Sequence, residues 1–436
     1  MPWVTRIKML FFKMPLTLIY DFVFLILFVI FFPYLVFKRK WHRGFAMRWG
    51  VFPQDIPTTL KQGKNIWVHA VSVGEVLAMR GLIRALKERF PGYQVIMSTV
   101  TKAGYKVAAS QLQEEASTIL YAPLDLSWIV NRYIKLIRPH IYIVAETEIW
   151  PNLFMALKRQ GVPIILVNGR ISDKAFKGYS RWRYFLRRIL NCVDHFCVQS
   201  QGDAQRIIHL GVDCSRVEAV GNLKFDNLPL KTEFGLRDFG FNGHELLWIA
   251  GSTHSGEEEI VLKVFKSLLF EFPNVRLVIA PRHVERTDEV VGLIKGFDLP
   301  AVRLSELHSA TQKPRSVVVV DTVGHLRSLY GLSKIVFVGK SLTVQGGHNI
   351  IEPAFFANAI VVGPHMQNFR DVMGIFLQHQ AIIQVENANQ LSVQIRRLLR
   401  HPQEITRLGQ SAREVIQKYQ GATEKTLKVI EELITV

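Results

Sequence analysis

Glu75 is the first of several side chains whose type and position could do chemistry. It lies in WVHAVSVGEV, where an apolar run typical of a buried strand ends and a helical stretch begins. A carboxylate at such a place could act as a general base. Ser72 and Glu75 also have the S-x-x-E spacing of a capping box, so a purely structural role for Glu75 stays open.

Two more carboxylates follow an apolar run in IVAETEIWPNL. Glu146 and Glu148 stand at the carboxyl end of a predicted strand, where a carboxylate is costly unless it is hydrogen-bonded or faces a ligand. Because side chains alternate along a strand, we expect the two to point to opposite sides and to have different roles. One of them could simply face solvent. Pro151 fits the first turn of the helix that follows.

Two segments of the second half of the chain offer groups that suit an anion. GSTHSGEEE, residues 251–259, is a turn that opens a helix, and its backbone N–H groups suit a phosphate or a carboxylate. Ser255 and the acidic run could instead cap that helix. Arg282 and His283 directly follow another apolar run, and a guanidinium can hold a phosphate through two hydrogen bonds. Neither segment has the glycine pattern of a dinucleotide or nucleoside triphosphate site.

The most informative segment is FVGKSLTVQGGHNIIEPAFFANAIVVGPH, residues 337–365. Its paired glycines allow a close backbone approach, and Asn349 or Glu352 can cap the helix that follows. A sugar nucleotide needs this combination, with N–H groups at a helix end for phosphate and a carboxylate for the ribose hydroxyls. A tight strand-to-helix turn would explain the glycines equally well, but it leaves His348 unexplained.

The elements that must position these groups form two alternating α/β halves. Apolar runs alternate with amphipathic helical stretches, which predicts parallel sheets with crossover helices. The fold class is therefore α/β, with two Rossmann-like, doubly wound domains whose strand carboxyl ends face a ligand cleft. The predicted strands are residues 66–71, 94–99, 141–145, 164–168 and 195–198 in the first half, and 246–250, 275–280, 316–320, 335–338 and 360–362 in the second.

Breaks in this pattern give the domain boundaries. We expect a membrane anchor with basic flanks over residues 1–45, an N-terminal Rossmann-like domain over 46–225, a linker over 226–243, and a C-terminal Rossmann-like domain with terminal helices over 244–436.

The predicted anchor is the apolar run from Leu16 to Phe37, which would make about 33 Å of helix, enough to cross a bilayer core. Basic residues flank the run on both sides and are more numerous after it, which predicts a single anchor with the body of the protein on the cytoplasmic face. Asp21 and Pro33 weaken a simple spanning helix. A helix that lies in the membrane interface, with both flanks on anionic lipid, is the alternative.

The chain of 436 residues has a formal net charge of +18, which indicates anionic partners. Its three cysteines have no metal-ligand or disulfide spacing, so no metal is expected. Aromatic residues are spread through predicted cores, which argues against a nucleic-acid partner. A cationic stretch in the first half could hold an anionic membrane surface or ligand phosphates, or could be a solvated helix face. It consists of Arg170, Lys174, Lys177, Arg181, Arg183, Arg187 and Arg188.

Taken in chain order, these segments are similar to the 3-deoxy-D-manno-octulosonic acid (Kdo) transferases over nearly the whole chain. The resemblance is carried by WVHAVSVGE, ETEIWP, APRH, DTVGHL at residues 321–326 and GGHNIIEP. It implies an inverting glycosyltransferase of the GT-B type that moves Kdo from CMP-Kdo to a lipid A precursor, lipid IVA, in lipopolysaccharide synthesis at the bacterial inner membrane. It implies no cofactor. The first domain would bind the acceptor and the second the donor.

The resemblance also implies roles for individual residues. Glu75 would be the general base, and Glu146 would lie on the acceptor side of the site. One departure is Lys340, where the family often has a glycine, and this puts the local backbone in doubt. The residues implied to bind CMP are Pro281, Arg282, Val323, Gly324, His325, Asn349, Ile350, Ile351 and Glu352.

Two other functions stay open at this stage. One is a membrane-associated GT-B glycosyltransferase that uses a different sugar nucleotide and another lipid acceptor, because the fold alone fixes neither. The other is a membrane-attached scaffold that keeps the sheets but performs no catalysis.

Overall fold

The computed structural model describes residues 16–37, 44–54, 56, 60, 63–226, 236, 241, 245–307 and 315–435. The basic flanks of the predicted anchor at residues 6–13 and 38–43, and nearly all of the predicted linker, lie outside these residues. The chain divides into two compact units, one of residues 1–227 and 420–436 and the other of residues 228–419. Each unit contains one seven-stranded sheet, and all strand pairs in both sheets are parallel.

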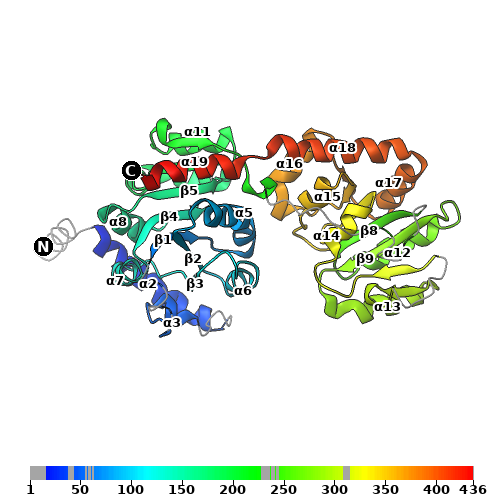
Figure 1. Ribbon diagram of the computed structural model, residues 1–436, viewed down its shortest axis with the longest axis horizontal. Coiled ribbons are helices and arrows are strands. Elements are labelled where there is room, and N and C mark those ends of the chain that lie inside the picture. The colour runs from blue at the N-terminus through cyan, green and yellow to red at the C-terminus, as the bar shows by residue number, and fades with distance from the viewer. Residues whose placement is uncertain are drawn as a thin grey trace, which may run out of the picture. The chain divides into compact units, whose positions relative to one another are not determined.

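The first sheet has the strand order β3-β2-β1-β4-β5-β6-β7 (Figure 1). The central strands β1, β4 and β5 are almost entirely buried, as expected for a parallel sheet with helices on both faces. The chain order changes direction between β1 and β4, which makes this place a topological switch point. The strands are β1 (Lys64–His69), β2 (Tyr93–Thr99), β3 (Thr118–Tyr121), β4 (Pro139–Ala145), β5 (Ile164–Gly169), β6 (His195–Val198) and β7 (Val217–Ala219).

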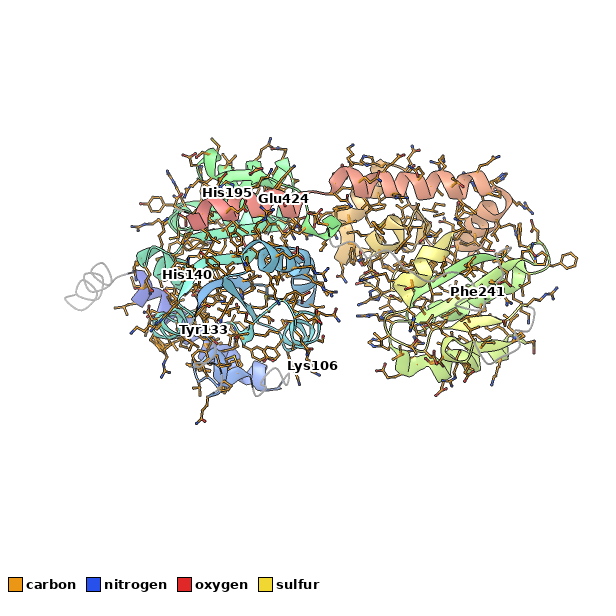
Figure 2. The ribbon with its side chains drawn as sticks, in the orientation of Figure 1. Lys106, Tyr133, His140, His195, Phe241 and Glu424 are labelled. Atoms are coloured by element: carbon orange, nitrogen blue, oxygen red, sulfur yellow. The ribbon has the colours of Figure 1, made fainter. Side chains whose placement is uncertain are left out.

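Helices cover both faces of the first sheet. One face carries the apolar side chains of α2, α7, α8, α10 and α11, and the other carries those of α5, α6 and α19. Tyr133 of α7 is buried in the first of these layers, where its hydroxyl donates to the carbonyl of Tyr121 at 2.6 Å (Figure 2). The helices are α2 (Leu16–Phe37), α3 (Phe45–Arg48), α5 (Val73–Arg89), α6 (Lys102–Gln111), α7 (Ser127–Ile137), α8 (Pro151–Arg159), α9 (Asp173–Arg181), α10 (Arg183–Leu190), α11 (Gln201–His209) and α19 (Ala422–Thr435).

Helix α2 packs on the first unit through one face. Phe24, Leu25 and Phe28 contact the core, and the buried carboxylate of Asp21 accepts hydrogen bonds from the backbone N–H of Ser127 at 3.0 Å and from other groups of the same unit. Asp21 is thus satisfied by protein groups. No helix within the described part of the chain is long and apolar enough to cross a membrane, so the predicted spanning anchor over residues 1–45 is not supported.

The second sheet has the strand order β10-β11-β9-β8-β12-β13-β14, with a switch point between β8 and β12. Its strands are β8 (Leu246–Thr253), β9 (Val275–Pro281), β10 (Ala301–Arg303), β11 (Val317–Val319), β12 (Ile335–Val338), β13 (Ala359–Val362) and β14 (Ile383–Gln384). Its helices are α12 (Glu257–Leu268), α13 (Thr287–Gly296), α14 (Leu326–Leu332), α15 (Ile351–Phe355), α16 (Arg370–Gln378), α17 (Ala388–Arg400) and α18 (Pro402–Tyr419).

The last helix, α19, packs on the first unit and not on the second. Figure 1 shows α19 beside the strands of the first unit. Leu427 and Ile430 are buried in the core on the α5 side of the first sheet, and Arg89 of α5 forms an ion pair of 2.7 Å with Glu431. The predicted C-terminal domain over residues 244–436 therefore extends too far. An amphipathic pattern indicates that one helix face is buried, but not which core buries it.

Candidate active site

The loops after β1 and β4 flank the switch point of the first sheet, and they carry the carboxylates that the sequence singled out. Glu75 lies in the first turn of α5 and is 8% exposed. Its Oε2 accepts a hydrogen bond from the backbone N–H of Val71 at 2.7 Å, and its Oε1 accepts one from the hydroxyl of Ser72 at 2.8 Å. Ser72 is the N-cap residue, but its side chain does not cap the helix. The Glu75 carboxylate therefore reaches back across the helix start.

Burial raises the pKa of Glu75 above its usual value, and the negative charge of Glu146 adds to this rise. The hydrogen bonds from Val71 and Ser72 act in the opposite direction. A raised pKa makes a carboxylate a better proton acceptor near neutral pH. The sequence predicted two roles for Glu75, a structural role at the helix start and a role as general base. One geometry is compatible with both.

Glu146 and Glu148 lie in the loop after β4, and their arrangement differs from the prediction. Strand β4 ends at Ala145, and Glu146 has a left-handed backbone with φ of 56°. Strand alternation therefore stops before these residues. Burial raises the pKa of Glu148 to about 7, and the charges of Glu75 and Glu146 contribute. All three carboxylates thus act on one another. Strand alternation, on which the prediction of opposite directions rested, does not apply to Glu146 and Glu148, and their separate roles stay a prediction.

The loop after β4 is fixed at its far end by Asp125. This buried carboxylate accepts hydrogen bonds from the backbone N–H groups of Asn152 at 3.1 Å and Leu153 at 2.9 Å, in the first turn of α8. The rings of His69 and Trp150 lie edge to face at 5.5 Å beside this loop. Their Nε2 and Nε1 atoms have no hydrogen-bond partner among the described residues. The carboxylates therefore sit on a loop that is anchored to the core and next to unsatisfied polar atoms.

In the second unit, Glu257 connects the two loops at the switch point. This carboxylate is fully buried and accepts hydrogen bonds from the backbone N–H of His254 at 2.9 Å and Lys340 at 2.7 Å, and also from Ser341 and Leu342. The turn after β8 is thus held by Glu257, not by a Ser255 cap. The loops after β8 and β12 are clamped together at the carboxyl edge of the sheet.

Basic and imidazole side chains gather at this edge. The ring of His254 lies 5.2 Å from that of His348 and 6.0 Å from that of His283. Burial lowers the pKa of His348 to about 3, and the positive charges of Arg282 and Lys340 contribute, together with the two other histidines. The structure therefore brings the residues after β8, β9 and β12 into one cluster that suits an anion.

The structure places the other predicted CMP-binding residues at the same edge of the second sheet. Val323 is 84% exposed in the loop that leads through Gly324 and His325 to α14. The Oδ1 of Asn349 accepts a hydrogen bond from the N–H of Ile351 at 3.0 Å, but Ile350 and not Asn349 is the N-cap residue of α15. Glu352 lies 3.4 Å from the guanidinium of Arg327 on α14.

Two of the predicted residues differ from the rest. The side chains of Ile350 and Ile351 are buried in the core, at 0% and 1% exposure, so only their backbone groups are available to a ligand. Pro281 is the buried last residue of β9 and directs the chain to the exposed Arg282. The sequence singles out Glu148 without giving it a role, and it predicts the turn of His254 and Glu257 only as a source of backbone N–H groups.

Comparison with known proteins shows the family to which the chain belongs. Residues 43–227 match the family described as 3-deoxy-D-manno-octulosonic-acid transferase (kdotransferase). The chain is 31% identical over 371 residues to the 3-deoxy-D-manno-octulosonic acid transferase of Haemophilus influenzae, covering 84% of this chain and 86% of that protein. The chain belongs to the 3-deoxy-D-manno-octulosonic acid transferase family. It is also 30% identical over 369 residues to the enzyme of that name from Rickettsia felis, covering 84% of this chain and 78% of that protein.

A solved structure supports the fold of this transferase. The UDP-GlcNAc 2-epimerase from Neisseria meningitidis, bound to UDP-GlcNAc, superposes with a TM-score of 0.57 over 84% of this chain and 100% of that chain, at 12% identity. At this identity the similarity concerns the fold alone. The transferase thus has two parallel-sheet α/β domains, a fold that it shares with this structure.

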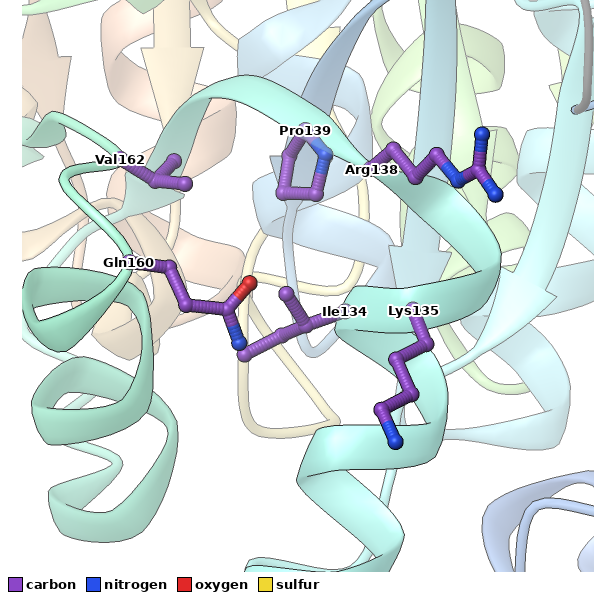
Figure 3. Close-up of a pocket in the computed structure, with 6 residues that line it drawn as sticks. All are labelled: Ile134, Lys135, Arg138, Pro139, Gln160 and Val162. Atoms are coloured by element: carbon purple, nitrogen blue, oxygen red, sulfur yellow. The ribbon is translucent and has the colours of Figure 1, made fainter.

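A pocket of about 500 Å³ lies away from these loops (Figure 3). It is formed at the end of α7, the start of β4 and the loop after α8, which is the amino edge of the first sheet. Its lining residues are Ile134, Lys135, Arg138, Pro139, Gln160 and Val162. Because ligands of doubly wound sheets bind at the opposite, carboxyl edge, this pocket is not the candidate active site of the transferase.

The cationic stretch of the transferase lies on α9, α10 and the loop before them, and all seven of its basic residues are exposed. Trp182 and Tyr184, which stand among them, are 67% and 87% exposed. A surface that combines exposed aromatic rings with cations differs from an ordinary solvated helix face.

Proposed function

We propose that this chain transfers Kdo from CMP-Kdo to the lipid A precursor lipid IVA in lipopolysaccharide synthesis, with inversion at the anomeric carbon and with Glu75 as the general base. The observation that carries this proposal is the buried Glu75 carboxylate at the switch point, with Glu146 and Glu148 beside it, in a member of the Kdo transferase family. In this proposal the first unit binds the acceptor and the second binds the donor.

The proposed reaction is a direct displacement. Glu75 takes the proton from an acceptor hydroxyl while that oxygen attacks the anomeric carbon of Kdo, and the bond to the CMP phosphate breaks on the opposite face. The Val71 N–H and the Ser72 hydroxyl hold the Glu75 carboxylate in one orientation. A positioned base of this kind contributes roughly 10²- to 10⁴-fold in rate. The raised pKa of Glu75 fits proton abstraction near neutral pH.

The donor side rests on the second unit. Arg282 is exposed at the end of β9 and can meet the phosphate charge that develops as CMP leaves. Glu352, next to Arg327, can accept hydrogen bonds from ribose hydroxyls. Val323, Gly324 and His325 form the loop that would border the nucleotide. We propose no cofactor, because departing phosphate charge can be balanced by these groups.

A membrane lipid as acceptor is supported by helix α2. The inner face of α2 is tied to the segment after β4 that carries Glu146 and Glu148, because Asp21 accepts a hydrogen bond of 2.7 Å from Asn152 of α8. The outer face of α2 exposes apolar side chains. Exposed apolar area of this extent suits a lipid interface. The exposed residues are Leu18, Phe22, Val23, Ile26, Leu27, Val29, Ile30 and Phe31, at 45% to 68% exposure.

We therefore propose that α2 lies in the membrane interface, with the catalytic body on the cytoplasmic face of the bacterial inner membrane. The exposed basic residues of α9 and α10 would contact the anionic membrane surface or the phosphates of the acceptor. Exposed Trp182 and Tyr184 suit the headgroup region, where amphipathic rings are favoured.

Incubation of the purified protein with CMP-Kdo and tetra-acylated lipid A precursor in vesicles tests the proposal. Mass spectrometry of the lipid product should show the mass of one or more added Kdo residues. If the protein transfers no Kdo but transfers a sugar from another nucleotide in a parallel set of donors, the Kdo assignment is wrong and the protein is a different glycosyltransferase. Absence of transfer from every donor would favour a scaffold.

A further inference from the structure

Lys340 has an uncommon backbone for its residue type. Its φ is 58°, in the left-handed region that favours glycine. Two groups hold this conformation: the Glu257 carboxylate accepts from the Lys340 N–H at 2.7 Å, and the Lys340 carbonyl accepts from the N–H of Gly347 at 2.7 Å. A residue kept in a strained conformation by its surroundings at a candidate site suggests a function for its side chain.

The side chain of Lys340 lies over the glycine turn that precedes His348. A Cβ at Gly346, which has φ of 130°, would stand 3.1 Å from Cε and 3.5 Å from Nζ of Lys340. The missing side chain of Gly346 therefore leaves space for the Lys340 side chain. The Lys340 ammonium thus lies at the loop that also carries His348 and Asn349.

The side-chain charges that act on His348 are all positive. The carboxylate of Glu257 acts on His254, but it already accepts hydrogen bonds from four backbone N–H groups. Arg282 and Lys340 form no ion pair with any carboxylate in the described part of the chain, and both lower the pKa of His348. The Nε2 of His348 is buried and has no hydrogen-bond partner among the described residues. Cationic side chains that lie close together and form no ion pair repel one another, and a bound anion relieves this repulsion.

We propose that Lys340, with His254 and His348, forms an anion subsite in the second unit that takes a negatively charged group of the donor. The group is either the phosphate of CMP or the carboxylate of the transferred sugar acid, since both offer the same oxygen acceptors. The subsite rests on the proposed donor function, and it lies beside the groups implied to bind CMP. Glu257 is a positioning residue, because its carboxylate fixes the backbone of both loops.

The test compares Lys340→Met, which removes the charge and keeps the length, with Lys340→Arg, which keeps the charge. Lys295→Met on α13 is the matched control, because that lysine is exposed on the same unit. Affinities for CMP and for cytidine are measured by calorimetry, and KM for CMP-Kdo is measured by steady-state kinetics. Lys340→Gly checks the fold: relief of the left-handed φ should leave the melting temperature unchanged or higher.

If Lys340 contacts the phosphate, Lys340→Met should weaken CMP binding roughly 10- to 100-fold and leave cytidine binding unchanged. If it contacts the sugar carboxylate, CMP binding should be unchanged and KM for CMP-Kdo should rise by a similar factor. Lys340→Arg should restore most of either loss. Unchanged CMP affinity together with unchanged KM overturns the subsite while the donor assignment stands. A wild-type protein that neither binds CMP nor uses CMP-Kdo overturns the donor assignment, and the subsite falls with it.

Discussion

The side-chain amide of Asn152 donates a hydrogen bond of 2.7 Å to the carboxylate of Asp21, across 131 positions of the sequence. Asp21 lies on the inner face of α2, and Asn152 lies in the first turn of α8, directly after the loop of Glu146 and Glu148. The helix with the exposed apolar face is therefore tied to the loop that carries two of the candidate acceptor carboxylates.

Replacement of Asp21 by alanine should detach α2 from the first unit. The change removes the acceptor of the half-buried Ser127 N–H and hydroxyl and one of the two acceptors of the Asn152 amide, so we expect the free energy of unfolding to fall by about 2 to 4 kcal/mol. Urea unfolding followed by circular dichroism measures this. Asp21→Asn keeps one acceptor oxygen and should lose less. Equal stability of Asp21→Ala and the wild type would show that the contact does not hold the helix.

A charge on the outer face of α2 should weaken membrane binding. Ile26 is 45% exposed, and a glutamate there would have to enter an anionic interface. We expect Ile26→Glu to lower binding to vesicles that contain phosphatidylglycerol by at least about tenfold. Co-sedimentation measures the bound fraction. Val393→Glu, at a 63% exposed apolar residue of the second unit, is the control, and an equal effect of both changes would count against the proposed membrane face.

Replacement of Glu75 by glutamine should remove the base and keep the shape. We expect kcat to fall by roughly 10²- to 10⁴-fold, with CMP affinity unchanged, because the change lies in the first unit. The exposed Glu88→Gln on the same helix should retain activity. Single-turnover kinetics and calorimetry separate the two effects. A Glu75→Gln enzyme with wild-type turnover would require another base, and Glu148 would be the next candidate.

Glu148 should make stability depend on pH in a defined direction. Its pKa is about 7 in the folded protein against an ordinary 4.5, so the folded state binds more protons than the unfolded state between these values. The contribution of Glu148 to the free energy of unfolding therefore becomes less favourable as pH rises from 4.5 to 7. Glu148→Gln removes the charge, so the variant should melt higher than the wild type at pH 8 and equally at pH 4.

Thermal unfolding of Glu148→Gln at several pH values, with Glu88→Gln beside it, tests this sign. The exposed Glu88 replacement should shift the melting temperature by the same small amount at every pH. If the difference in melting temperature between Glu148→Gln and the wild type does not grow between pH 4 and pH 8, the raised pKa of Glu148 is contradicted.

Removal of the Glu257 carboxylate should destabilise the second unit. Four backbone N–H groups lose their acceptor inside the protein, so Glu257→Ala should lower the free energy of unfolding by more than about 3 kcal/mol. Glu259 is exposed on the same helix and paired with Lys263, and its change to alanine should lower the free energy of unfolding by less than about 0.5 kcal/mol. Denaturant unfolding measures both. Similar losses for the two variants would show that the clamp is not structural.

The sequence alone predicted the centre of each sheet and missed the edges. All ten predicted strands occur in the structure, with ends that shift by up to two or three residues. The four missed strands, β3, β7, β10 and β14, are the outermost strands of the two sheets. Central parallel strands are buried on both faces and need continuous apolar runs, whereas short edge strands do not.

The amino-acid sequence by itself determined the fold class, the central strands, the positions of Glu75, Glu146 and Arg282 at strand ends, and the resemblance to the Kdo transferases. These features depend on local apolar periodicity and on ordered motifs, which a linear sequence contains in full.

Only the tertiary structure decided which of these residues act together. It placed α19 on the first unit, satisfied Asp21 through α8, put Glu148 under the electrostatic influence of Glu75 and Glu146, and gathered Lys340 with the histidines. The reason is that burial, hydrogen bonding and electrostatic coupling arise between elements far apart in the chain. Strand order, and not strand sequence, determines which loops meet at a switch point.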